Sequence, residues 1–187
     1  MRVVAGVARG RKLQAPPGRR LRPTSERVRE AVFSSLGSID AVAGATVLDL
    51  FAGTGALGIE ALSRGAAAAT FVDADHAAIR AIEANLATTG LGDRAKVVYS
   101  DALRFLTDTT ETYDLALVDP PYSFDAWFPL LERLPARLAV LEAGEHIAVP
   151  PPWIALKSRR HGDSVVTLVR REPEAGPQPE EDGGGTG

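Results

Sequence analysis

The sequence predicts an α/β fold: a doubly wound, mostly parallel sheet with helices on both faces. From residue 45 onward, short apolar runs alternate with amphipathic segments, which is typical of βαβ units. Acidic residues directly follow several of these runs, at what would be the carboxyl-terminal edge of the sheet. The length of 187 residues is enough for one such domain and hardly enough for two.

The expected elements can be placed in order along the chain. A helix is expected over 23–37, with Thr24 or Ser25 as N-cap and with Arg27 and Arg29 pointing away from its apolar stripe. Strands are expected over 45–51, 68–75, 94–101 and 113–122, and helices over 55–65, 76–90 and 102–108. Apolar runs at 138–141 and 154–156 and the alternating segment 164–170 would complete the sheet with a late hairpin and an antiparallel edge strand.

Charge divides the chain into three parts. Residues 1–30 carry nine basic and two acidic side chains, whereas residues 31–171 carry twelve basic and seventeen acidic ones. The short apolar run VVAGV and the glycines and prolines after it predict a small basic hairpin arm over 1–22, of a kind that binds polyanions. The main domain is expected over 23–171. Residues 172–187, with five acids and no base, are expected to form a disordered tail.

Composition excludes several classes of site. The chain has no cysteine, and its three histidines lack the spacing of metal ligands, so we expect neither a disulfide nor a metal site. No apolar stretch has the length of a signal peptide or a membrane span. We therefore expect a cytoplasmic protein with no membrane partner.

The segment DLFAGTGALG (49–58) places Gly53, Gly55 and Gly58 between a predicted strand and a predicted helix. Such a loop brings backbone N–H groups and a helix N-terminus close to a ligand, because no Cβ obstructs the approach. The same spacing occurs in NAD sites. The motif therefore indicates a nucleotide-like ligand without identifying it.

Two further acids end neighbouring strands. Asp73 in FVDAD is placed to accept hydrogen bonds from ribose hydroxyls, and Asp75 is expected to cap the next helix. Asp101 in SDAL could accept from an adenine amino group. Acids at the ends of successive parallel strands meet at the edge where such sheets bind ligands.

The segment DPPY, Asp119 to Tyr122, indicates the chemistry. A carboxylate and a proline carbonyl can accept both N–H groups of an exocyclic amine and direct its lone pair at a methyl donor. The prolines present no competing N–H donor, and Tyr122 can stack on a base that has left its helix. Hydride transfer with NAD would require a proton-shuttling constellation that the sequence lacks.

At GTGALG, FVDAD, SDAL and DPPY the chain resembles class I S-adenosylmethionine-dependent methyltransferases that modify amino groups. The arm MRVVAGVARGRKL, the segment RPTSERVREAVF and the run LDLFAGTGALGIEALSRGA resemble, more narrowly, the bacterial 16S rRNA guanine-N2 methyltransferases of the RsmD family. The similarity extends from Met1 to about Arg171. It implies a seven-stranded Rossmann-like sheet, S-adenosylmethionine as cofactor with S-adenosylhomocysteine as product, and 16S rRNA in the assembled 30S subunit as substrate.

Matched motif by motif, the resemblance implies roles for individual residues. The cofactor would be held at its methionine part by Asp49, Gly53 and Gly55, at its ribose by Asp73, and at its adenine by Asp101 and Ala102. The guanine N2 would be oriented by Asp119 and the carbonyl of Pro120, beside Pro121, with Tyr122 stacked on the flipped base. RNA phosphates would be contacted by Arg9, Arg11, Lys12, Arg22 and Arg27.

Other functions agree with the same motifs. DPPY suits adenine N6 as well as guanine N2, so an adenine-N6 nucleic-acid methyltransferase is one alternative, although it would need a larger target-recognition region. A non-catalytic ribosome-assembly factor on the same fold is another. The sequence leaves open which guanine is modified and whether the substrate is naked rRNA or an assembled subunit. It also leaves open the role of the tail and the oligomeric state. We expect a monomer.

Overall fold

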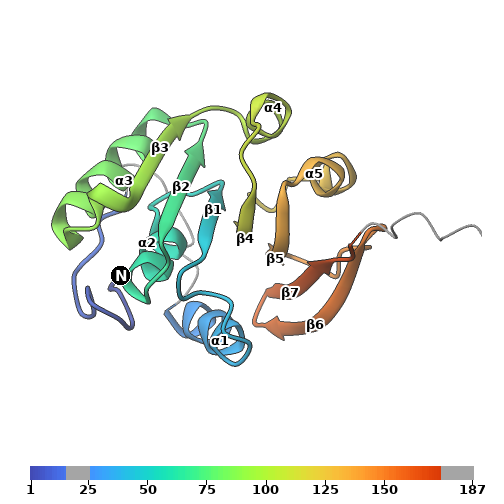
Figure 1. Cartoon of the computed structure of the whole chain (residues 1–187), viewed down its shortest axis with the longest axis horizontal. Coiled ribbons are helices and arrows are strands. Elements are labelled where there is room, and N and C mark those ends of the chain that lie inside the picture. Colours follow the sequence, from blue (N-terminus) through green and yellow to red (C-terminus); the bar gives the residue numbers. More distant parts are fainter. Residues whose placement is uncertain (16–25, 174–187) are drawn as a thin grey trace, which may run out of the picture.

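A seven-stranded sheet forms the centre of the computed structural model, which describes residues 1–15 and 26–173 (Figure 1). Its strands are β1 (Thr46–Leu50), β2 (Ala68–Asp73), β3 (Ala95–Tyr99), β4 (Tyr113–Val118), β5 (Ala136–Ala143), β6 (Trp153–His161) and β7 (Ser164–Arg171). They lie in the order β3-β2-β1-β4-β5-β7-β6, and β7 is antiparallel to both of its neighbours while the other pairs are parallel. The predicted fold class is confirmed.

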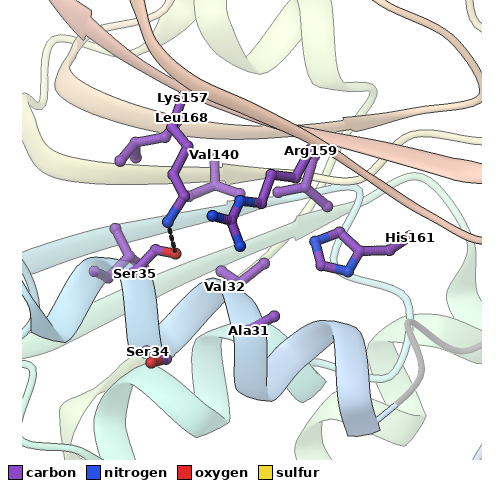
Figure 2. A pocket seen from close by; sticks show the side chains of 11 residues that line it. Ala31, Val32, Ser34, Ser35, Val140, Lys157, Arg159, His161 and Leu168 are labelled. Carbon is purple, nitrogen blue, oxygen red and sulfur yellow. Dashed lines mark hydrogen bonds between the residues drawn. The ribbon is translucent and has the colours of Figure 1, made fainter.

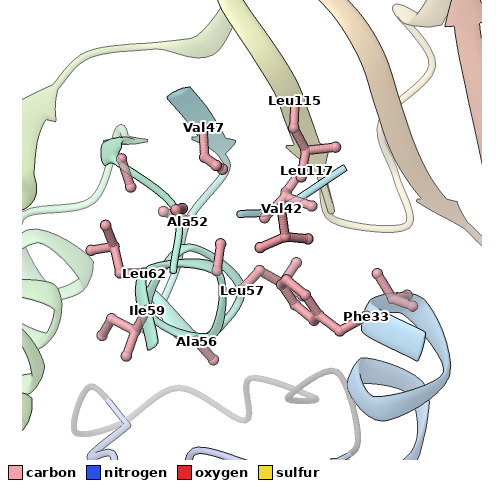
Figure 3. Packing of buried hydrophobic residues seen from close by; sticks show 14 of the residues in the cluster. Phe33, Val42, Val47, Ala52, Ala56, Leu57, Ile59, Leu62, Leu115 and Leu117 are labelled. Carbon is pink, nitrogen blue, oxygen red and sulfur yellow. The ribbon is translucent and has the colours of Figure 1, made fainter. Parts of the chain in front are cut away.

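Helices cover both faces of the sheet because alternate strand residues point in opposite directions. On one face, α1 (Glu26–Gly37), α2 (Ala56–Ser63) and α3 (His76–Thr89) pack against a core that includes Val47 and Leu117 (Figure 3). On the other, α4 (Ala102–Asp108) and α5 (Trp127–Arg133) pack against Leu48 and Val118. No helix in the described part of the chain is long and apolar enough to cross a lipid bilayer.

The structure differs from the sequence-based expectation near the carboxyl terminus. Helix α5 was not predicted; it is short and contains Pro129, which its first turn tolerates because that N–H has no helical partner. Strand β6 runs on through an exposed charged stretch to His161 and forms the edge of the sheet. The alternating segment, β7, lies between β5 and β6 instead of at the edge.

The amino-terminal residues pack onto the domain. Within 1–15 the strand-like pairing is a single antiparallel bridge between Arg2 and Lys12, not a regular hairpin. Val3, Ala8 and Leu13 are buried in the same core as α2. At Gly6 the φ angle is +82°, and a Cβ there would lie 1.8 Å from the carbonyl oxygen of a residue on α2, so the turn requires glycine.

Several predictions concern residues outside the described ranges. These are the N-cap role of Thr24 or Ser25, the RNA contact of Arg22, and the disordered tail beyond residue 173.

Candidate active site

A cleft of about 670 Å³ opens at the carboxyl-terminal edge of the sheet, where the strand order reverses between β1 and β4. Most of the predicted ligand-binding residues line it: Asp49, Gly53, Asp73, Asp101, Ala102, Asp119, Pro120, Pro121 and Tyr122. They belong to or directly follow the adjacent strands β3, β2, β1 and β4. Parallel pairing brings these four strand ends together although they span more than 70 residues of sequence.

The glycine loop is tied to the neighbouring strand. Gly53 has a φ angle of +58°, and its N–H donates to Oδ2 of Asp73 over 2.8 Å. Gly55, with φ +74°, is the N-cap of α2; a Cβ there would lie 3.3 Å from Ile82 in the core. Gly55 does not appear among the described residues that line the cleft, so its effect is to turn the chain into the helix.

Gly58 permits the close packing of α2 against the sheet. A Cβ at this position would lie 2.3 Å from the ring of Phe71 and 3.0 Å from Oδ2 of Asp49. Its N–H donates to the same Oδ2 over 2.8 Å. The third glycine of the motif therefore brings a backbone donor to a buried carboxyl group and does not face the cleft itself.

Asp49 is the buried acid of the cleft, with an exposed fraction of 1%. Burial raises the pKa of Asp49 well above its usual range, the Gly58 N–H opposes this, and the neighbouring charges of Asp119 and Asp73 raise the pKa further. A cationic ligand in the cleft would compensate these crowded negative charges.

Asp49→Asn is expected to raise the melting temperature of the ligand-free protein at pH 8. A raised folded-state pKa means that the native protein stabilises protonated Asp49, and this contribution is lost as pH rises above the ordinary carboxyl range. Asparagine keeps an acceptor for Gly58 and carries no charge. Melting curves of the variant and the wild type at pH 8 and pH 4 check this prediction. The increase in melting temperature should be smaller at pH 4, where Asp49 of the wild type is protonated. A lower melting temperature at both values would show that the carboxylate stabilises the fold.

The acids after β2 and β3 accept hydrogen bonds from nearby backbone N–H groups, and they also line the cleft. Asp75 caps α3 by accepting from the N–H of Ala77 over 2.8 Å, as predicted. Asp101 caps α4 by accepting from the N–H of Arg104 over 3.1 Å, and it also lines the cleft. The carboxylate of Asp73 accepts from two backbone N–H groups. A carboxylate has about four acceptor positions, so Asp73 and Asp101 each retain capacity toward a ligand.

DPPY lines the same cleft as the glycine loop, at the end of the neighbouring strand β4. Asp119 is partly buried and Pro120 is buried, directly after the last residue of β4. Tyr122 is 57% exposed as a residue, and its hydroxyl lies 2.9 Å from Oγ of Ser164 on β7. The tyrosine is thus anchored at its polar end while its ring remains accessible.

The sequence analysis missed a buried ion pair beneath the amino-terminal residues. Arg29 was expected to point away from the apolar stripe of α1, and this was wrong: it is fully buried, with Nε 3.6 Å from Oε2 of Glu60. Burial lowers the pKa of Arg29, and Glu60 opposes the shift. The Glu60 carboxylate also accepts from the N–H groups of Val4 at 2.8 Å and Ala5 at 3.0 Å. A lone acid within the apolar run of α2 was the available signal.

Asn85 makes a second connection between the amino-terminal residues and the cleft. This buried side chain of α3 accepts from the N–H of Gln14 over 2.8 Å and donates to the carbonyls of Gln14 and Thr54. Thr54 lies in the glycine loop, and Met1 lines the same cleft. A polar residue between Ile82 and Leu86 on an otherwise apolar helix face was the available signal here.

The predicted RNA contacts lie outside the cleft wall. Arg9, Arg11 and Lys12 are exposed on the amino-terminal segment, and Arg27 is exposed in the first turn of α1. In the described part of the chain, no group of three or more histidine or acidic residues is placed to hold a metal ion.

The sheet order and the cleft at its carboxyl-terminal edge are those of class I methyltransferases. The fold is similar to that of solved structures: the Escherichia coli methyltransferase yhhF has a TM-score of 0.81 at 36% identity, covering 92% of this chain and 98% of that one. The Thermus thermophilus protein TTHA0928 has a TM-score of 0.79 at 32% identity, covering 91% and 99%.

The chain belongs to the family described as Conserved hypothetical protein 95, whose model matches residues 1–170. It is 45% identical over 122 residues to ribosomal RNA small subunit methyltransferase D of Escherichia coli K12, a match that covers 65% of this chain and 60% of that protein. The protein of the same name from Haemophilus influenzae is 32% identical over 174 residues, covering 87% and 89%. The predicted family is confirmed.

Proposed function

We propose that the chain transfers a methyl group from S-adenosylmethionine to the exocyclic N2 of a guanine in 16S rRNA. The observation that carries this proposal is the convergence of four strand-end acids, a glycine loop and DPPY on one cleft. The names of the relatives support the substrate class. The proposal extends to the assembled 30S subunit as substrate and to a cytoplasmic monomer.

The cleft suits the cofactor in size and charge. Its volume of about 670 Å³ lies in the range of small-molecule sites. When bound, the cofactor supplies a methyl group on a positively charged sulfur, and the acids of the cleft favour such a cation. In the proposal, Asp49 and the backbone at Gly53 hold the methionine part, Asp73 the ribose, and Asp101 with Ala102 the adenine.

The residues of DPPY would orient the amine. The N2 lone pair of guanine is delocalised into the ring, so the amine is a weak nucleophile until acceptors draw its N–H groups out of the ring plane. Asp119 and the Pro120 carbonyl would be these acceptors, and Tyr122 would stack on the extruded base. The proton lost after transfer can pass to Asp119 or to water, so most of the rate arises from positioning.

Methyl incorporation from labelled S-adenosylmethionine into unmethylated small ribosomal subunits tests the proposal. Nucleoside analysis of the digested RNA should yield N2-methylguanosine, and protein-free 16S rRNA in parallel distinguishes naked from assembled substrate. N6-methyladenosine would identify an adenine enzyme instead. Absence of label on either substrate, with measurable cofactor binding, would contradict the proposal.

Arg11→Glu combined with Lys12→Glu is expected to weaken RNA binding and flatten its salt dependence. Each phosphate contact that is lost reduces the number of counterions that binding releases from the RNA. The slope of the logarithm of the association constant against the logarithm of the salt concentration should therefore fall in magnitude by about one per residue. Both side chains are exposed, so folding should be unaffected. Filter binding to 16S rRNA over a salt series measures the slope. An unchanged slope would remove the amino-terminal segment from the RNA site.

A further inference from the structure

A second pocket, of about 230 Å³, lies between α1 and the β6–β7 hairpin (Figure 2). Its apolar floor is formed by Val32 and Leu36 of α1, Val140 of β5, and Leu168 of β7. The motifs that define the cofactor cleft do not contribute to it. The pocket can accept a small planar or ring-shaped group against an apolar surface.

The rim of this pocket is cationic. Lys157, Arg159 and His161 occupy alternate positions on edge strand β6 and point toward α1 (Figure 2). Lys157 Nζ lies 3.0 Å from Oγ of Ser35. The guanidinium group of Arg159 makes no hydrogen bond or ion pair with any residue in 1–15 or 26–173. The described lining residues include no acid, so the rim is complementary to an anion.

The pocket adjoins the proposed active site at one shared residue. His161 lines both the pocket and the larger cleft, at the end of β6 where the chain turns toward Ser164. Ser164 in turn lies 2.9 Å from the hydroxyl of Tyr122. A ligand chain that places one unit on the tyrosine ring could therefore continue past His161 into the second pocket.

We propose that this pocket binds a nucleotide of the RNA strand that flanks the target guanine. The proposal rests on the proposed function. Lys157 and Arg159 contact the backbone phosphate, and the apolar floor carries the ribose or the face of the base. A cationic rim above an apolar floor matches a nucleotide, which joins an anionic phosphate to a ring. The pocket would hold the strand in place while the target base occupies the cleft.

Lys157→Glu combined with Arg159→Glu tests the cationic rim. The dissociation constant for protein-free 16S rRNA should rise about tenfold or more, with a shallower salt slope, while the affinity for S-adenosylhomocysteine stays unchanged. Arg104→Glu combined with Arg133→Glu is the matched control, because both arginines are exposed on α4 and α5 at the opposite face of the sheet and the pair changes the net charge by the same amount. Equal RNA affinity of the double variant and the control would overturn the proposal.

Ala31→Phe tests the floor independently, since it fills the pocket from α1 without changing charge. We expect weaker RNA binding at all salt concentrations and an unchanged slope. If charge reversal weakens binding and Ala31→Phe does not, the surface is a cationic patch and the nucleotide pocket is rejected. If both variants bind free RNA normally but fail to methylate assembled subunits, the pocket serves a protein partner and the proposal is also rejected. Absence of methylation by the wild-type chain would instead count against the proposed function, because RNA binding is measured separately.

Discussion

Asp119→Ala is expected to lower methyl transfer by about 10²-fold or more, because the variant loses an acceptor that orients the reacting amine. Affinity for S-adenosylmethionine should stay within a few-fold. The ionised carboxylate of Asp119 raises the pKa of Asp49, so its removal leaves Asp49 more readily ionised toward a cationic cofactor. Single-turnover rates and calorimetric cofactor binding measure the two effects separately.

Asp125→Ala provides the matched control for this variant. Asp125 is exposed in the loop after DPPY and is not among the described residues of the cleft. Removal of the Asp125 carboxylate should change neither the rate of methyl transfer nor the affinity for S-adenosylmethionine. If Asp119→Ala abolishes cofactor binding together with activity, Asp119 belongs to the cofactor site or to the fold, and its orienting role is wrong.

Glu60→Ala is expected to lower the free energy of unfolding by about 3–5 kcal/mol, the usual effect of breaking a buried ion pair. The variant leaves the buried charge of Arg29 without its partner, and it removes the acceptor of the Val4 and Ala5 N–H groups. We also expect earlier proteolysis within residues 1–15, which are held to α2 by these bonds. Urea denaturation and timed digestion measure the two effects.

Glu83→Ala is the control for charge and helix content, because Glu83 is an exposed acid on α3. The double variant Arg29→Met with Glu60→Gln should recover much of the lost stability, since neither buried charge remains. If Glu60→Ala resembles the Glu83 control, the buried pair does not hold the amino-terminal segment in place.

Much of the site was predictable because it depends on local signals. The glycine spacing, the acids that follow apolar runs and the double proline of DPPY each reflect a requirement at one strand end, and the parallel direction of β1 to β5 follows from the βαβ pattern. Helix α5 and the full length of edge strand β6 were not predicted because their sequence patterns are weak. A proline lies in the first turn of α5, and charged residues dominate the solvent-exposed part of β6.

The sequence by itself determined the fold class, the family and most of the acidic and DPPY residues that meet in the cleft, because motif spacing and strand alternation are local properties. The tertiary structure alone decided that Arg29 is buried against Glu60, that Asn85 joins Gln14 to the glycine loop, and that the cationic side of β6 faces α1. Each of these pairs residues distant in the chain. Burial changes the environment of their charges and polar groups, and no local pattern reveals which partner a buried polar group will find.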